Sequence, residues 1–293
     1  YKMAISLGGG GSASVINETI DINSAENLIT LADGRVYLKG GVTSTDLTTY
    51  PDATHGFAYT GTSFGLSGGT GAGPTGITWD GTYFWVVSIS DDAVFKYNAS
   101  GVYQNVSWST ASQELQPNGI EWDGTYFWVV GRSNERIYKY NASGVYQNVS
   151  WSTGAQTRPT GIAWDGTYFW VVGRDIDKVY KYNASGVYQN FNFSVAGQET
   201  NPADIAWDGT YLWVVGVGSG KTHKYNTSGV YQNESFFVNS QDTAPSGLTW
   251  DGTHFRVTGQ TTDTVYEFAD QIGVNSVSSG YGLLGQQNYV RIK

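Results

Sequence analysis

The chain alternates short apolar runs with turns rich in glycine and asparagine, and no segment keeps an apolar period near 3.6 residues. Residues 117–151 are representative, with runs at 119–122, 126–130, 137–140 and 145–151 that we name strands a, b, c and d. Strand b is aromatic or β-branched on both faces, which favours a strand covered by neighbours on both sides. Strand d alternates more clearly, as a strand with one wet face does. The pattern predicts an all-β fold.

This four-strand unit is repeated along the chain. The tripeptide Trp-Asp-Gly occurs five times, at spacings of 43, 42, 43 and 43 residues. Its aspartates are Asp80, Asp123, Asp165, Asp208 and Asp251. Roughly 40–50 residues and four strands are usual for one blade of a β-propeller. A two-sheet sandwich or an open solenoid remains an alternative, although both leave a terminal repeat uncovered and no polar capping repeat is visible.

The blade count depends on the two ends of the repeat region. Four repeats are complete, but the fifth has no clear strand d after Phe268. Residues 60–67 have the register of a strand d and precede the first repeat. We expect this N-terminal strand to complete the last blade and close a five-bladed ring. Six blades are the alternative, if residues 52–68 supply more than one strand.

The flanking segments predict a separate small β unit. Residues 35–39 are predicted to form a strand after the turn residues Asp33 and Gly34, and residues 289–293 are predicted to form another. We therefore divide the chain into a propeller at 52–270 and an N-terminal unit at 1–51 that is joined by 271–293. This second unit is expected to serve attachment or oligomerisation.

Comparison of the repeats with one another separates constant turns from variable ones. The a–b turn is Asp-Gly-Thr in all five copies and the c–d turn is nearly constant, whereas the b–c turns and d–a loops differ widely. In an up-and-down blade these two sets lie at opposite ends, so the variation gathers on one face. Rigid scaffolds commonly present binding sites on such loops, although neutral drift of exposed loops is the alternative. The candidate ligand-binding residues are Asp91, Asp92, Arg132, Glu135, Arg136, Arg158, Arg174, Asp175, Asp177, Lys178 and Lys221, with Trp108 and Trp151 of strand d expected to be accessible.

The repeated aromatic and acidic positions have structural explanations. The Trp-Asp-Gly carboxylates are expected to cap their turns by accepting backbone N–H groups. The strand b tryptophans, Trp85, Trp128, Trp170 and Trp213, are expected in the core between blades rather than as sugar-stacking platforms. The fifth copy has Arg256 in this place, so one contact between blades must differ.

Composition narrows the function further. A formal net charge of −9 argues against nucleic acid and against docking on an anionic membrane, and no apolar stretch is long enough for membrane insertion. The chain has no cysteine, and its three histidines show no metal-ligand spacing. Glycan cleavage would need a convergent carboxylate pair, which the sequence does not display. We expect a protein that is not an enzyme and that binds no metal and no cofactor.

The unit Trp-Asp-Gly-Thr-Tyr-Phe-Trp-Val-Val…Tyr-Lys-Tyr-Asn-Ala-Ser-Gly-Val-Tyr resembles propeller repeats of bacteriophage virion proteins, particularly tail-fibre-like ones. Residues 3–8 and 31–39 are also similar to the N-terminal region of such proteins. The resemblance implies a structural virion protein, a tail fibre or similar appendage, released by lysis without a signal peptide. Its implied partners are other virion proteins and a host-surface glycan or receptor, and it implies a homo-oligomer, with a trimer possible. The alternative is a secreted five-bladed lectin with repeated sugar sites.

Overall fold

The computed structural model describes residues 56–66, 68–69, 73–154 and 158–270, together with four short strands near the ends of the chain. Contacts divide the chain into one compact unit at 57–269 and a second formed by 1–56 with 270–293. In the second unit β1 (Leu28–Thr30), β2 (Val36–Lys39), β24 (Tyr289–Ile292) and β23 (Val277–Ser278) form one antiparallel sheet in that order. The terminal segments therefore do pair with each other as predicted. An attachment role of this unit stays a prediction, since most of its residues lie outside those described.

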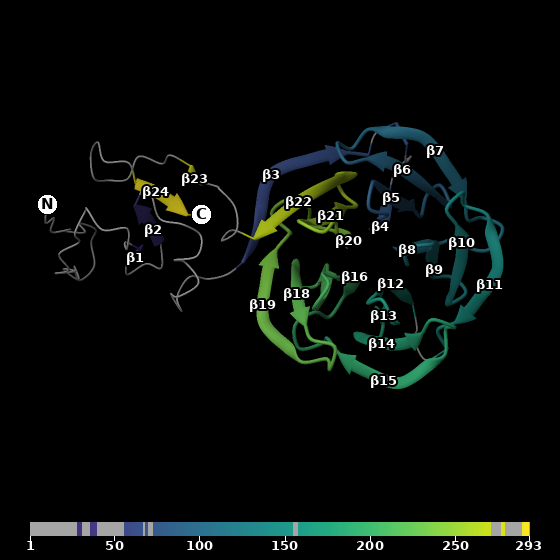
Figure 1. Cartoon of the computed structure of the whole chain (residues 1–293). Helices are drawn as coiled ribbons and strands as arrows, with labels where there is room; N and C mark the ends of the chain where they lie inside the picture. Colours follow the sequence, from purple (N-terminus) through teal and green to yellow (C-terminus); the bar gives the residue numbers. More distant parts are fainter. Residues whose placement is uncertain are drawn as a thin grey trace, which may run out of the picture. The chain divides into compact units, whose positions relative to one another are not determined.

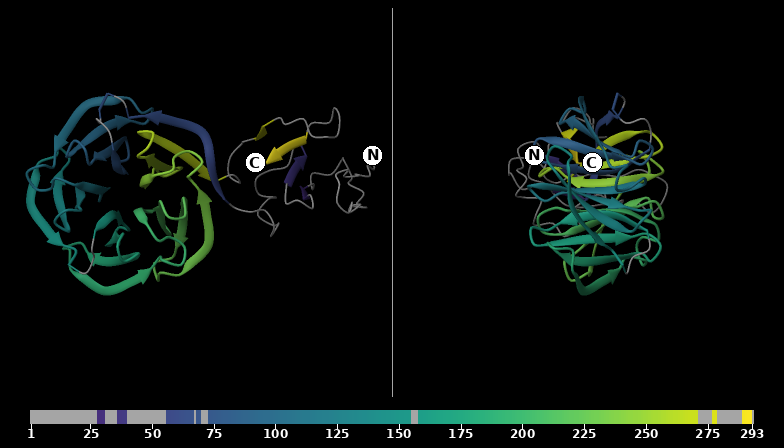
Figure 2. Two further views of the ribbon diagram at one scale, coloured as in Figure 1. Left: turned by 180° about the vertical axis from the view of Figure 1, so that it is seen from behind. Right: turned by 90° about the vertical axis from the view of Figure 1, so that its right-hand side faces the viewer.

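Residues 57–269 form a closed ring of five four-stranded antiparallel sheets, seen from its two faces in Figures 1 and 2. Strand a of each blade lies nearest the axis and strand d lies outermost. Blade 1 is β4 (Pro74–Trp79), β5 (Tyr83–Ser88), β6 (Ala93–Asn98) and β7 (Tyr103–Ser109); blade 2 is β8 (Pro117–Trp122), β9 (Tyr126–Gly131), β10 (Arg136–Asn141) and β11 (Tyr146–Ser152); blade 3 is β12 (Pro159–Trp164), β13 (Tyr168–Gly173), β14 (Lys178–Asn183) and β15 (Tyr188–Ser194). Blade 4 is β16 (Pro202–Trp207), β17 (Leu212–Gly216), β18 (Lys221–Tyr225) and β19 (Tyr231–Phe237); blade 5 is β20 (Pro245–Trp250), β21 (Phe255–Gly259), β22 (Thr264–Asp270) and β3 (Phe57–Gly65).

The ring closes through β3, which supplies the outer strand of blade 5 from the N-terminal side of the propeller. The Leu66 N–H donates to the Asp263 carbonyl at 2.8 Å, and the Leu66 carbonyl accepts from the Tyr97 hydroxyl of blade 1 at 2.9 Å. On the inner side, the Ser246 hydroxyl of blade 5 donates to the Pro74 carbonyl of blade 1 at 2.8 Å. The five-bladed prediction is confirmed, and the six-bladed alternative is wrong because residues 56–66 make a single strand.

The innermost strands pack backbone against backbone, which explains a recurrent glycine in strand a. A Cβ at Gly119 would lie 2.7 Å from the Thr160 carbonyl oxygen of the next blade, closer than side chains can approach. Blade 4 carries Asp204 at this position instead. Its carboxylate is buried and accepts the Ile205 and Leu248 N–H groups at 2.8 and 2.9 Å, and burial raises its pKa well above the ordinary value.

Tryptophans of strand b fill the junctions between blades as predicted. Trp85 of blade 1 is 3% exposed and packs on Phe127 of blade 2 with ring centroids 4.7 Å apart. The same contact joins Trp128 to Phe169 at 4.8 Å. Trp213 packs on Phe255 in the same way at 4.9 Å, whereas Trp170 shares a cluster with Leu212 and Arg256 stands over Phe84. Every blade therefore packs on both of its neighbours, and the loops stand on a packed support.

Candidate functional site

The variable loops meet at the ends of the two innermost strands. In each blade the residue after strand b donates its N–H to the carbonyl of the residue just before strand a. Arg132 bonds Gln116 in this way at 3.1 Å, and Arg174 bonds Arg158 at 3.0 Å. These paired positions therefore ring the axis on the variable-loop face, nearer to it than any other loop residues.

Three arginines from two neighbouring blades gather in this ring. Arg158 Nη1 lies 3.1 Å from Asp175 Oδ1, and Arg174 Nε donates to Asn201 Oδ1 of blade 4. Burial lowers the pKa of Arg132 and of Arg174, and the nearby Arg158 charge lowers both further. Arginine stays charged despite such shifts. The cluster thus gathers three positive charges near two carboxylates, Asp175 and the buried Glu199, in a chain whose net charge is −9.

The other three predicted basic residues lie away from this arginine cluster. Arg136 donates from Nη2 to the Ser150 hydroxyl of outer strand β11 at 2.9 Å. Lys178 is paired across the sheet with Ser194 of β15, and the Lys221 ammonium lies 4.2 Å from the ring centroid of Phe237. All three are therefore associated with outer strands, and the structure does not bring them together with Arg132.

Most of the predicted acidic residues shape the hairpins that carry them. Asp92, Glu135 and Asp177 have φ values of 49°, 56° and 48°, in the left-handed region that a tight b–c turn requires. Their carbonyl groups accept N–H groups from the residue that follows strand d, as Asp92 does from Thr110 at 2.7 Å. Asp91 accepts the Ser88 hydroxyl at 2.6 Å within the same turn. Turn geometry therefore accounts for these residues without a ligand.

The prediction that Trp108 and Trp151 are accessible is wrong. They are 9% and 8% exposed and pack against the next blade, with Trp108 4.7 Å from Tyr140 between ring centroids. The next blade's c–d turn covers them, because Gly144 lies directly on the Trp108 ring and a Cβ there would collide with it. These tryptophans belong to the core between blades and offer no sugar platform.

Sequence reasoning missed a set of buried carboxylates that fix the variable loops. Glu199 is fully buried and accepts the Asn201, Gly218 and Ser219 N–H groups at 2.7, 2.9 and 3.0 Å. Glu114 and Asp242 hold the corresponding loops of other blades in the same way. An acid recurring at 114, 199 and 242, at spacings of 85 and 43 residues, was the available signal.

One of these carboxylates lies beside a serine and a histidine, but the arrangement is not a catalytic triad. Ser219 Oγ donates to Glu199 Oε2 at 2.5 Å and lies 2.9 Å from His223 Nε2. A triad needs the histidine between the serine and the acid, whereas here the serine is in the middle. His223 is 5% exposed and burial lowers its pKa, so it is a neutral core residue.

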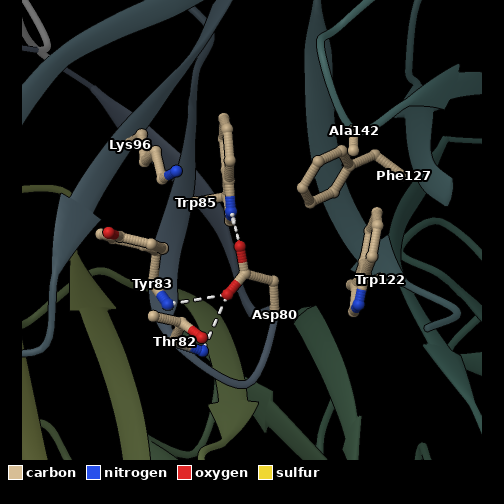
Figure 3. A pocket seen from close by; sticks show the side chains of 8 residues that line it. All are labelled: Asp80, Thr82, Tyr83, Trp85, Lys96, Trp122, Phe127 and Ala142. Carbon is tan, nitrogen blue, oxygen red and sulfur yellow. Dashed lines mark hydrogen bonds between the residues drawn. The ribbon is translucent and has the colours of Figure 1, made fainter. Parts of the chain in front are cut away.

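A pocket of about 230 Å³ opens in the junction between blades 1 and 2, at the end with the constant turns (Figure 3). Its lining is Asp80, Thr82, Tyr83, Trp85 and Lys96 from blade 1, with Trp122, Phe127 and Ala142 from blade 2. Asp80 caps the turn as predicted, accepting the Thr82 and Tyr83 N–H groups at 2.8 and 2.7 Å. Its second oxygen accepts Trp85 Nε1–H at 2.6 Å, a bond that the sequence analysis did not foresee.

The pocket lining belongs to the repeat. Lys96 lies 3.7 Å from the Tyr83 ring centroid and 5.1 Å from that of Trp85. Lys139, Lys181 and Lys224 stand over their own Tyr and Trp rings in the same manner. Equivalent walls therefore exist at several junctions.

No group of three or more metal-ligating side chains is found among the residues described, and no helix in that part of the chain is long and apolar enough to cross a membrane. No protein-family model matches the chain, and no curated protein matches it.

One solved structure with a similar fold is a glutaminyl cyclase, and two others are less similar. The glutaminyl cyclase of Myxococcus xanthus superposes with a TM-score of 0.59 at 9% identity, covering 74% of this chain and 97% of that one. Regucalcin from Agrobacterium tumefaciens gives 0.48 at 12% identity, covering 70% and 93%. A virginiamycin B lyase of Staphylococcus aureus gives 0.45 at 16%, covering 91% and 87%. At such identities the likeness to the cyclase concerns the fold alone, and that fold is a β-propeller.

Proposed function

We propose that the chain is a non-enzymatic structural protein of a phage virion, a tail fibre or similar appendage, whose propeller binds an anionic group through the arginine cluster. The ligand is an acidic host-surface glycan, or an acidic patch on a neighbouring virion protein. The virion assignment depends on the resemblance of the repeats, and the binding assignment depends on the geometry of Arg132, Arg158 and Arg174.

The arginine cluster has the chemistry of an anion site. Guanidinium groups match carboxylate, sulfate and phosphate groups through paired N–H donors, and such charge-assisted bonds are stronger than neutral ones. Within the described part of the chain, Arg132 has no carboxylate partner, and Arg174 is bonded only to the neutral Asn201. An anion would relieve the repulsion among the three groups. The observation that carries the proposal is the gathering of these three guanidinium groups at the ends of the innermost strands.

The support beneath the cluster favours binding without rearrangement. The Glu114 carboxylate accepts the Gln116 N–H at 2.8 Å and the Ser133 N–H at 3.3 Å, so the loops on both sides of Arg132 are fixed. A site held in advance loses little conformational entropy when it binds.

The test replaces Arg132, Arg158 and Arg174 by glutamine together. The matched control replaces Arg136, Lys178 and Lys221, which removes the same charge from the outer part of the same face. Host adsorption and binding to an array of acidic and neutral glycans are measured for both. Each charged hydrogen bond is worth about 1.5–3 kcal/mol, so we expect the first variant to lose acidic-glycan binding by about 100-fold or more and the control to retain it. Unchanged adsorption in the first variant would overturn the proposed site, and absence of the protein from purified particles would overturn the virion assignment.

A second candidate, a lectin with one sugar site per blade, is favoured by the repeated lining of the pocket in Figure 3. It predicts several equivalent sites by calorimetry with neutral monosaccharides, unaffected by the arginine replacements.

A further inference from the structure

The protein fills one of its own junctions with an aromatic ring. Phe57, the first residue of β3, lies in the junction between blades 4 and 5. Its ring centroid is 5.3 Å from that of Trp213, 6.1 Å from Trp250 and 4.8 Å from Phe255, all in T-shaped arrangements. Edge-to-face contacts at these distances are the favoured geometry of aromatic pairs.

The walls around Phe57 are the counterparts of the pocket in Figure 3. Trp85, Trp122 and Phe127 occupy the same repeat positions in the first junction as Trp213, Trp250 and Phe255 do in the fourth. Phe64 of β3 and Trp108 of β7 occupy the same repeat position, because each packs against a c–d turn glycine of the next blade. Seven residues before them stand Phe57 and Gly101, which are therefore equivalent positions.

Phe57 therefore occupies the repeat position that a c–d turn glycine holds in the complete blades. In blade 2 this residue is Gly144, which has no side chain to enter the groove. The pocket of about 230 Å³ remains open there. That volume is below the roughly 300–1,000 Å³ of sites for drug-sized ligands, so it suits a single ring.

The charge beside the ring position differs between the filled and the open junctions. In blade 4 the Lys224 ammonium is paired with Glu234 at 2.7 Å. The repeat positions equivalent to Glu234 in blades 1, 2 and 3 are Val106, Val149 and Phe191. Lys96, Lys139 and Lys181 have no carboxylate partner in the described part of the chain. The pocket between blades 1 and 2 thus offers an aromatic slot lined by a lysine with no ion-pair partner among the described residues and by the Asp80 carboxylate, which already accepts three N–H groups.

We propose that the pocket between blades 1 and 2, and its counterpart between blades 2 and 3, bind a small aromatic carboxylate. The ring takes the place that Phe57 takes in the fourth junction, and the carboxylate neutralises the junction lysine. These sites lie among the constant turns, whereas the arginine cluster lies among the variable loops. The proposal does not rest on the proposed function, and we expect ring binding to survive the replacement of Arg132, Arg158 and Arg174.

The test follows 4-fluorophenylacetate by fluorine NMR line broadening, with 4-fluorotoluene as the neutral ring. Ala142 and Ala184 are exposed turn residues at the mouths of these two junctions, so A142W and A184W combined should fill the pockets without touching the core. We expect the acid to bind the wild-type chain and to lose its binding in this variant. Circular dichroism and the urea midpoint confirm that the variant is folded.

Two further variants separate the charge from the ring. Replacing Lys96 and Lys139 by methionine should weaken the acid about tenfold, or about 1.4 kcal/mol, and leave the neutral ring unchanged. Phe57→Ala should create an additional site for 4-fluorotoluene. No broadening with the wild-type chain, or equal broadening with the tryptophan variant, would overturn the proposal. Binding of N-acetylglucosamine in place of the acid would overturn the proposal in favour of the lectin hypothesis.

Discussion

Blade 5 differs from the other four blades in the pair of side chains that face each other across strands b and c. In blades 1 to 4 a strand b tryptophan lies opposite a strand c lysine, whose ammonium is about 5 Å from the indole centroid. In blade 5 the same cross-strand positions hold Arg256 and Glu267. Arg256 Nη1 lies 2.6 Å from Glu267 Oε2, and Arg256 Nε donates to Asp251 Oδ2 at 2.9 Å, replacing the indole N–H of the other blades.

Restoring one partner alone should therefore be harmful, and restoring both should be tolerated. The Arg256 and Glu267 side chains are 10% and 13% exposed, and breaking a buried pair costs about 3–5 kcal/mol. Residual water access lowers this, so we expect R256W and E267K each to lose about 2–3 kcal/mol of unfolding free energy. The double variant rebuilds an indole N–H bond to Asp251 and a cation–π contact worth about 0.5–2 kcal/mol, and it should lie within about 1 kcal/mol of the wild type.

The assay is a double-mutant cycle from urea unfolding followed by far-ultraviolet circular dichroism, with each variant's transition fitted between its own folded and unfolded baselines. These values imply a coupling energy of at least about 3 kcal/mol, at or above the upper end for contacting residues. His254 stands where the other blades have a tyrosine beneath the lysine, so adding H254Y to the double variant should raise stability further. Losses that simply add, within about 0.5 kcal/mol, would refute the claim that the two substitutions act as one unit.

Two further predictions concern the axis and the junctions. Burial raises the pKa of Glu121 from 4.5 to about 8, so the folded chain holds a proton that the unfolded chain releases between these values. Its stabilisation is complete below about pH 4.5 and is lost as the pH rises through 8. Glu121→Gln, which cannot ionise, should match the wild type at pH 5 and exceed it by about 3 kcal/mol at pH 8.5 in urea unfolding; parallel pH profiles would contradict this. Gly144→Ala and Gly124→Ala both place alanine at positive φ, but only the first meets a ring, that of Trp108. We expect Gly144→Ala to cost about 1–3 kcal/mol more than Gly124→Ala in the same assay, and equal losses would argue against the packing described.

Much of the fold could be predicted because its signals are local. The Asp-Gly turns mark each a–b hairpin, the repeat spacing sets the blade, and the missing strand after Phe268 points to a partner elsewhere in the chain. The exposure of Trp108 could not be predicted in this way. Its burial is decided by a c–d turn of the next blade, about 36 residues further on, and alternation within one strand carries no information about that neighbour.

The candidate site, too, could be predicted from the sequence only in part. Arg132 and Arg136 are only four residues apart and looked equivalent in sequence, yet one follows strand b beside the axis and the other begins strand c and reaches an outer strand. The role of Glu114 was also hidden, because its partners lie in its own loop and in the following b–c turn. Positions within a hairpin could be assigned from the pattern, but convergence of hairpins from different blades could not.

Departures from the repeat fall into two groups with different causes. Arg256, Glu267 and Phe57 lie in the blade that closes the ring. Arg256 and Glu267 pair with each other across the β21–β22 hairpin, and Phe57 of β3 fills the groove beside Trp213 and Phe255. Arg132 and Arg174 lie in complete blades, where closure requires nothing of them. Arg158 lowers the pKa of both, although Arg174 also bonds Asn201 and lies near the Asp175 and Glu199 charges. Packing within the repeat explains the first group but not the gathering of the second, and the proposed anionic ligand would supply further opposite charge.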